Sequence, residues 1–150
     1  MPREQGPHAV CAACATVSYR NPAVGVAVVV LQKGRVLLGR RRRGPYHGRW
    51  CIPCGYVDWD EDIRAAARRE LEEETGLQVE VGSVCAVHSN FHDRARQTVG
   101  VWFWGTVVGG ALRPADDLDA VRFFGLDKLP ELAFPTDGKV LEEIGRLLGC

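Results

Sequence analysis

Hydrophobic and polar positions along the chain separate into strand-like and helix-like stretches. Residues 24–31 form a nearly continuous apolar run, Lys33-Gly34 can turn the chain, and residues 36–39 are again apolar. Two apolar runs joined by a short turn predict a β-hairpin. Three further strands are predicted from alternating, β-branched or aromatic sequence, over residues 77–90, 97–108 and 121–126.

Two stretches have the signals of helices. The first is predicted to begin at Asp58 or Asp60, since either suits an N-cap, and to end at Gly76. The second follows Pro135-Thr136-Asp137 and closes the chain. Its apolar positions recur at helical spacing, at Val140, Leu141, Ile144, Leu147 and Leu148. One early helix and one late helix among several strands predict an α+β fold.

The first predicted helix gathers carboxylates on the face that should pack inward. On a wheel of about 100° per residue, Glu70, Glu73 and Glu74 share one face and Glu72 points away. Earlier positions of the same face are apolar, at Ile63, Ala66 and Ala67. A run of charges usually marks a solvated surface. Here the wheel favours a cluster that leans toward the core.

Inward-facing carboxylates are costly unless a positive partner joins them. Arg69 lies four residues before Glu73 and can orient one carboxylate, but one guanidinium cannot neutralise three acids. Mg²⁺ takes oxygen ligands, from one or two carboxylates, water and substrate phosphates. The cluster therefore predicts a Mg²⁺ or Mn²⁺ site in preference to zinc.

Charge and hydropathy exclude several classes of function. Lysine plus arginine and aspartate plus glutamate number 19 each, so bulk binding of nucleic acid or anionic membrane is not expected. The longest apolar run, residues 23–31, is too short to span a bilayer. The first ten residues contain no apolar signal-peptide segment, so a cytoplasmic location is expected. A small anionic substrate recognised locally fits this composition.

The stretch GYVDWDEDIRAAARRELEEETGL, residues 55–77, resembles the Nudix box. The matching fixed positions are Gly55, Glu61, Arg69, Glu70, Leu71, Glu73, Glu74, Gly76 and Leu77. The resemblance implies a Nudix α/β/α sandwich with a mixed central sheet over residues 21–150. It also implies a hydrolase acting on acid anhydrides, which cleaves a nucleoside diphosphate linked to another group.

The resemblance implies roles for the residues of the box. Glu70, Glu73, Glu74 and the carbonyl of Cys54 would hold the metal, and Glu73, Glu70 and Arg69 would be the catalytic residues. Gly55 would allow a close approach of the backbone. Glu61 lies on the opposite side of the helix from Glu70, so we expect a structural role for it.

Other candidates lie outside the helix. The general base is expected to be Glu73 or an acid of the loop that carries Asp116, Asp117 and Asp119, although that loop can equally be an ordinary turn. Arg40 is a candidate to bind substrate phosphate, and Tyr46 to stack on a base. Trp50 is expected to belong to the core.

Residues 1–20 are predicted to be irregular. Their CAAC motif resembles the second knuckle of a zinc ribbon that precedes some Nudix domains. A structural zinc ion needs four ligands, so a vestigial ribbon is expected. The alternative is a zinc site built from Cys11, Cys14, Cys51 and Cys54.

The ribbon-like relatives imply a substrate of the ADP-ribose, NADH or FAD type. A nucleoside triphosphate is the runner-up, and a non-catalytic domain that binds nucleotides for regulation is the alternative of another class. Many members of the family form dimers, so a homodimer is also expected.

Overall fold

A computed structural model describes residues 8–149 of the 150-residue chain. The elements are β1 (His8–Val10), β2 (Val17–Tyr19), β3 (Ala23–Gln32), β4 (Arg35–Arg41), β5 (Trp50–Cys51), β6 (Cys54–Tyr56), α1 (Ile63–Thr75), β7 (Leu77–Asn90), β8 (Thr98–Gly110), β9 (Leu118–Gly125) and α2 (Pro135–Leu147). The predicted α+β class is confirmed. None of the helices described is long and apolar enough to cross a membrane.

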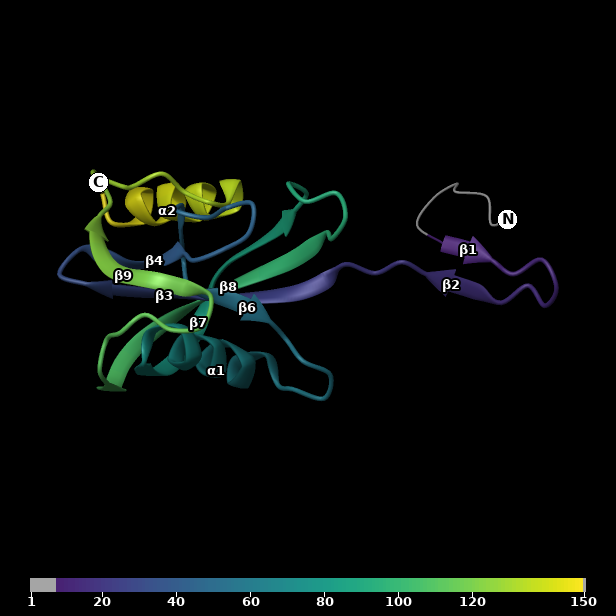
Figure 1. The fold of residues 1–150 in the computed structure, drawn as a ribbon, viewed down its shortest axis with the longest axis horizontal. Coiled ribbons are helices and arrows are strands. Elements are labelled where there is room, and N and C mark those ends of the chain that lie inside the picture. The colour runs from purple at the N-terminus through teal and green to yellow at the C-terminus, as the bar shows by residue number, and fades with distance from the viewer. Residues whose placement is uncertain (1–7, 150) are drawn as a thin grey trace.

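Strand β3 is the centre of a mixed sheet. It runs parallel to β8 from the pair Ala23–Thr98 to the pair Val30–Gly105, and its pairings with β4 and β6 are antiparallel. Strand β7 pairs with β8 at one edge, while β4 continues the sheet through β5 and β9. Helices α1 and α2 lie on opposite sides of this sheet (Figure 1). The predicted sandwich with a mixed central sheet is confirmed.

The nearly continuous apolar run of β3 is explained by burial on both faces. Val26, Val28 and Val30 pack with residues of α1, including Leu71. Alternate residues such as Val29 face the other side, in the cluster that contains Val140, Leu141 and Ile144 of α2. Because side chains alternate across a strand, a strand covered on both faces needs apolar residues at every position.

The start of α1 corrects a sequence prediction. The N-cap is Asp62, whose Oδ1 accepts hydrogen bonds from the backbone N–H groups of Arg64 and Ala65 at 3.0 and 3.1 Å. Asp58 and Asp60 belong to the preceding turn, where Asp60 has a positive φ of 62°. The predicted stop at Gly76 is confirmed: its φ is 74°, and its N–H bonds to the carbonyl of Glu72.

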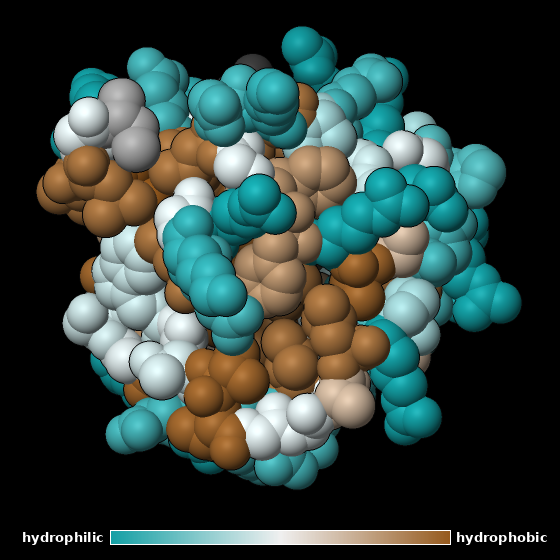
Figure 2. All heavy atoms as spheres, turned by 90° about the vertical axis from the view of Figure 1, so that its left-hand side faces the viewer, coloured by the Kyte–Doolittle hydropathy of each residue, from teal (hydrophilic) through white to brown (hydrophobic). Residues whose placement is uncertain are grey.

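The N-terminal segment also differs from the prediction. Residues 8–19 are not irregular, because β1 and β2 pair as an antiparallel hairpin. This hairpin projects away from the sandwich at the right of Figure 1. Residues 1–7 and Cys150 lie outside the part of the chain that the structure describes, and the predicted division at residue 20 stays a prediction. The opposite end of the molecule exposes a hydrophobic patch surrounded by hydrophilic residues (Figure 2).

Candidate active site

Helix α1 buries two of the three acids that the wheel placed on its inward face. Glu74 is 1% exposed, and the side chain of Glu70 is 15% exposed. The side chain of Glu73 is 46% exposed and lies at the rim, while Glu72 faces solvent. The inward cluster therefore consists of two carboxylates inside and one at its edge.

Arg69 is held mainly by Glu61. Its Nε and one terminal nitrogen donate to the two Glu61 oxygens at 2.7 and 2.9 Å, a bidentate arrangement. Its other terminal nitrogen donates to Glu70 at 2.9 Å and approaches Glu73 only to 3.3–3.4 Å. The hydrogen bonds from Arg69 lower the pKa of Glu61 to about 2. Glu61 thus anchors the arginine that positions Glu70, which agrees with the structural role expected for it.

Glu74 is a buried carboxylate with only one of its oxygens satisfied. Oε1 accepts a hydrogen bond from the backbone N–H of Cys54 at 3.2 Å. Oε2 is buried and has no hydrogen-bond partner within residues 8–149. Burial, followed by the nearby Cys54 and Glu70, raises the pKa of Glu74 well above its ordinary value. Such a group fits a site that a cation completes.

Gly55 makes room for the second buried carboxylate. A Cβ atom at this position would lie 2.0 Å from the carboxylate carbon of Glu70. Any side chain at residue 55 would therefore displace Glu70 from its place beside strand β6. The box glycine is required here by close packing rather than by an unusual φ.

The loop before β9 is fastened to the end of α1. The backbone N–H groups of Arg113 and Ala115 donate to the carbonyls of Thr75 and Glu74 at 2.9 and 3.1 Å. These bonds satisfy carbonyls that a helix end leaves without partners. They bring the loop residues 116 and 117 to the site.

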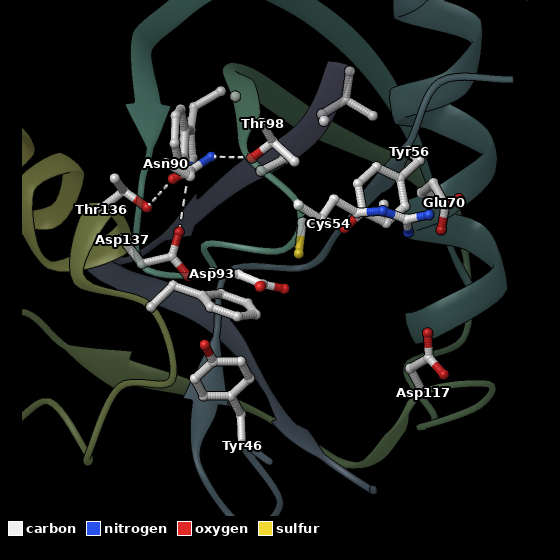
Figure 3. Close-up of a pocket in the computed structure, with 18 of the residues that line it drawn as sticks. Tyr46, Cys54, Tyr56, Glu70, Asn90, Asp93, Thr98, Asp117, Thr136 and Asp137 are labelled. Atoms are coloured by element: carbon white, nitrogen blue, oxygen red, sulfur yellow. Dashed lines mark hydrogen bonds between the residues drawn. The ribbon is translucent and has the colours of Figure 1, made fainter. Parts of the chain in front are cut away.

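The site opens into a cavity of about 500 Å³. Glu70, Cys54, Asp116 and Asp117 line one side of it. The opposite side consists of polar and aromatic groups, among them Tyr46, Asn90, His92, Thr98, Phe134, Thr136 and Asp137. The thiol of Cys54 points into the space between the two sides (Figure 3).

The opposite wall contains two separate hydrogen-bonded groups, one around Asn90 and one around Asp137. The hydroxyl of Thr136 donates to Asn90, and the Asn90 amide donates to Thr98 at 2.7 Å. Asp137 is 3% exposed and accepts from the backbone N–H of Ile52 at 3.0 Å and from Nε1 of Trp102 at 3.1 Å. Burial raises the pKa of Asp137 to about 7. The sequence predicts only a helix start at residues 135–137, although two polar residues shortly after the aromatic Phe134 are a usable signal of a polar site.

Of the two residues predicted to bind substrate, Tyr46 lies in the cavity wall, whereas Arg40 is paired with an aspartate beside it. Tyr46 lines the cavity and meets Phe134 edge-on at 5.1 Å between ring centroids. Arg40 donates from Nε to Asp119 at 2.7 Å and lies over the Trp50 ring. Trp50 is 8% exposed, so its expected core position is confirmed.

The neighbouring Arg41 is a cavity residue that the sequence does not distinguish from the other arginines of its run. It lines the cavity beneath Phe134, with its guanidinium 5.6 Å from the ring centroid. Its Nε is buried and has no hydrogen-bond partner within the described residues. Arg41 rather than Arg40 therefore presents an unsatisfied donor group beside the cavity.

The four cysteines of the alternative zinc site lie in two different places. Cys11 and Cys14 are exposed in the turn of the projecting hairpin (Figure 1). Cys51 is buried in the core, and Cys54 belongs to the cavity. Within residues 8–149 neither cysteine pair is joined by further histidine, cysteine or acidic side chains into a group that could hold a metal ion. Zinc at these four residues stays a prediction.

Comparison with known proteins identifies the class to which this fold and site belong. The NUDIX domain family matches residues 20–144. The ADP-ribose pyrophosphatase of Methanocaldococcus jannaschii is 34% identical over 129 residues, covering 85% of this chain and 76% of that protein. The RNA pyrophosphohydrolase of Caulobacter vibrioides is 38% identical over 143 residues, covering 83% of each chain.

Solved structures agree with this assignment. A NUDIX hydrolase from Nitrosomonas europaea superposes with a TM-score of 0.80 at 29% identity, over 95% of this chain and 81% of that one. A MutT NUDIX hydrolase from Burkholderia pseudomallei gives 0.76 at 30% identity, over 83% and 98%. The chain belongs to the Nudix family. It is a Nudix pyrophosphohydrolase, of a family that generally uses Mg²⁺ or Mn²⁺.

Proposed function

We propose that this enzyme hydrolyses the pyrophosphate bond of a nucleoside diphosphate derivative of the ADP-ribose, NADH or FAD type. The observation that carries the proposal is a cavity with two unlike sides, acidic at Glu70 and aromatic at Tyr46 and Phe134. A cation-bound pyrophosphate suits the first side, and a nucleobase stacks on the second. The M. jannaschii relative, named an ADP-ribose pyrophosphatase, supports the same substrate class.

Glu70, Glu73, Glu74 and the carbonyl of Cys54 would hold the metal. The buried Oε2 of Glu74, which no described group satisfies, and the space that Gly55 leaves for Glu70 both fit a cation there. A bound divalent cation would neutralise phosphate charge and lower the pKa of an attacking water. Arg69 contributes by fixing the carboxylate of Glu70 at 2.9 Å.

The general base is proposed to be Glu73, whose half-exposed carboxylate can accept a proton from water. Asp116 and Asp117 line the cavity and are the alternatives. Asp119 is a weaker candidate because its carboxylate is already paired with Arg40.

Substrate recognition is proposed to divide between two groups. Tyr46, supported by Phe134, would stack on the base. Arg41 would donate to a phosphate, since its Nε is buried without a partner in the described part of the chain. Arg40, the residue predicted from sequence, would support this contact from the neighbouring strand position.

A substrate panel with Mg²⁺ or Mn²⁺ tests the proposal. ADP-ribose, NADH, FAD and nucleoside triphosphates are compared by product release, and the first group is expected to give the highest kcat/KM. Glu73→Gln should abolish turnover, and Tyr46→Ala should mainly raise KM. Glu72→Gln, a change of the exposed acid on the same helix, is the matched control and should behave as wild type.

Three outcomes would contradict the proposal. A preference for nucleoside triphosphates would show that they, and not nucleoside diphosphate derivatives, are the substrate class. A Glu73→Gln enzyme as active as wild type would move the base to Asp116 or Asp117. Binding of nucleotides without any hydrolysis would contradict the catalytic assignment as a whole.

A further inference from the structure

The turn of the β1–β2 hairpin holds two thiols in a fixed conformation. The backbone N–H of Cys11 donates to the carbonyl of Thr16, and that of Ala15 donates to the carbonyl of Cys11, both at 2.9 Å. The Sγ of Cys14 lies 2.9 Å from the hydroxyl of Thr16. Both cysteines are exposed. Ala15 has a φ of 59°, a left-handed conformation that is unusual for a residue other than glycine.

Two cysteines separated by two residues have the spacing of a zinc ligand pair. A structural zinc ion takes four ligands in a tetrahedron, and this turn offers two. The described residues supply no third histidine, cysteine or acidic side chain to the pair. The pair formed by Cys11 and Cys14 therefore has half of the ligands that a structural zinc site needs.

The hairpin also has an apolar face with no cover in the described part of the molecule. The register pairs His8 with Tyr19 and Val10 with Val17, so these four side chains lie on one face. Val10 is 61% exposed and Tyr19 is 64% exposed. A two-stranded hairpin is marginally stable by itself in water. Within residues 8–149, the hairpin that projects from the sandwich thus has no packing partner (Figure 1).

We propose that two copies of this chain share one zinc ion, each contributing Cys11 and Cys14. A second copy is the partner whose chemistry matches, because an identical thiol pair completes a four-cysteine tetrahedron. A twofold axis through the metal relates the two pairs, as in other self-complementary interfaces. The same arrangement brings the two apolar hairpin faces beside each other. This inference does not depend on the substrate proposed above.

The test measures mass and metal content of the whole protein, purified under a non-thiol reductant with zinc supplied. Native mass spectrometry and light scattering should find a dimer that contains one zinc ion per two chains. Removal of zinc with a chelator should give monomers. X-ray absorption should show zinc surrounded by sulfur at about 2.3 Å, which separates this site from the carboxylates of the active site.

Variants locate the site. Cys11→Ser and Cys14→Ser should each lose the zinc ion and the dimer, while Cys85→Ser, a change of a cysteine on β7, should keep both. A monomer that binds one zinc ion per chain through sulfur would overturn the proposal. A dimer that survives in Cys11→Ser and Cys14→Ser would overturn it too, as would a zinc-free protein under these conditions.

Discussion

Two buried carboxylates, Glu74 on α1 and Asp137 on α2, differ in what surrounds them. They are 1% and 3% exposed, and burial raises the pKa of both. The two oxygens of Asp137 each accept a hydrogen bond from a fixed donor. Glu74 has one such bond, and its second oxygen has no partner within the described residues.

The difference supports the proposal that Asp137 serves the fold and that Glu74 serves the reaction. Asp137 joins the start of α2 to Ile52, between β5 and β6, and to Trp102 of β8. Its hydrogen bonds therefore hold two layers of the sandwich together. Glu74 is held in place through a single bond and keeps an acceptor available. A buried, unsatisfied acceptor costs stability unless an external group completes it.

Glu74→Gln tests the contrast between Glu74 and Asp137 and has the largest expected effect, a loss of activity. Loss of a proposed metal ligand should cost at least as much as loss of a group that only orients ligands, so kcat/KM should fall on the order of 10²-fold or more. The metal-free variant should unfold no more easily than wild type, because it no longer buries an ionisable acid. Activity assays and urea unfolding without metal measure the two effects. Glu72→Gln is the control.

A Glu74→Gln enzyme that is active but unstable would contradict this assignment. It would mean that Glu74 resembles Asp137, a carboxylate needed for folding.

Asp137 should make the protein less stable as the pH rises. A carboxylate whose pKa is lowered by folding has the opposite effect. Its pKa rises from 3.8 in the unfolded chain to about 7 in the folded one, so between these values the folded state binds the extra proton. Stability therefore falls as pH rises through this window, by about 3 kcal/mol between pH 5 and pH 8. Urea unfolding of wild type and Asp137→Asn measures it.

Asp137→Asn cannot titrate, and its amide cannot accept from both Ile52 and Trp102. The variant should be less stable than wild type at pH 5, and the gap should shrink toward pH 8. A gap that is constant with pH would show that Asp137 is ionised throughout.

Part of the site could be predicted from local patterns in the sequence. Glu70, Glu73 and Glu74 lie within five positions, so helical periodicity alone places them on one face. The two-sided burial of β3 was likewise visible as a continuous apolar run. Such patterns are local, and the sequence contains them completely.

The opposite wall depends on packing between distant segments. Asn90 and Thr136 are 46 residues apart and meet only because α2 docks beside the end of β7. Nothing local distinguishes Arg41 from Arg40 within a run of four arginines; the pairing of β4 decides which one reaches the cavity. The hydrogen-bond partners of Glu74 and Asp137 could not be predicted either, because they also come from segments distant in the sequence.

Gly55→Ala tests the space beside Glu70. The new Cβ would lie 2.0 Å from the carboxylate carbon, so Glu70 must move and activity should be lost. Because that carboxylate is the end of a flexible side chain, the cost in stability should stay within about 1 kcal/mol. Gly145→Ala in α2 is the control, since nothing lies within 4 Å of its Cβ position. Thermal unfolding and metal-dependent activity are measured for both. An active Gly55→Ala enzyme would show that Glu70 tolerates displacement.

Asp62→Ala has the smallest expected effect and concerns the helix that carries the carboxylates. Loss of the N-cap bonds to Arg64 and Ala65 should cost about 1 kcal/mol in the free energy of unfolding. Asp58→Ala should cost less, because Asp58 is largely exposed and approaches Arg69 only to 3.4 Å. Urea unfolding of the pair ranks them. The reverse order would restore Asp58 as the start of the helix, and an equal cost would mean that neither cap determines how firmly α1 holds Glu70 and Glu74.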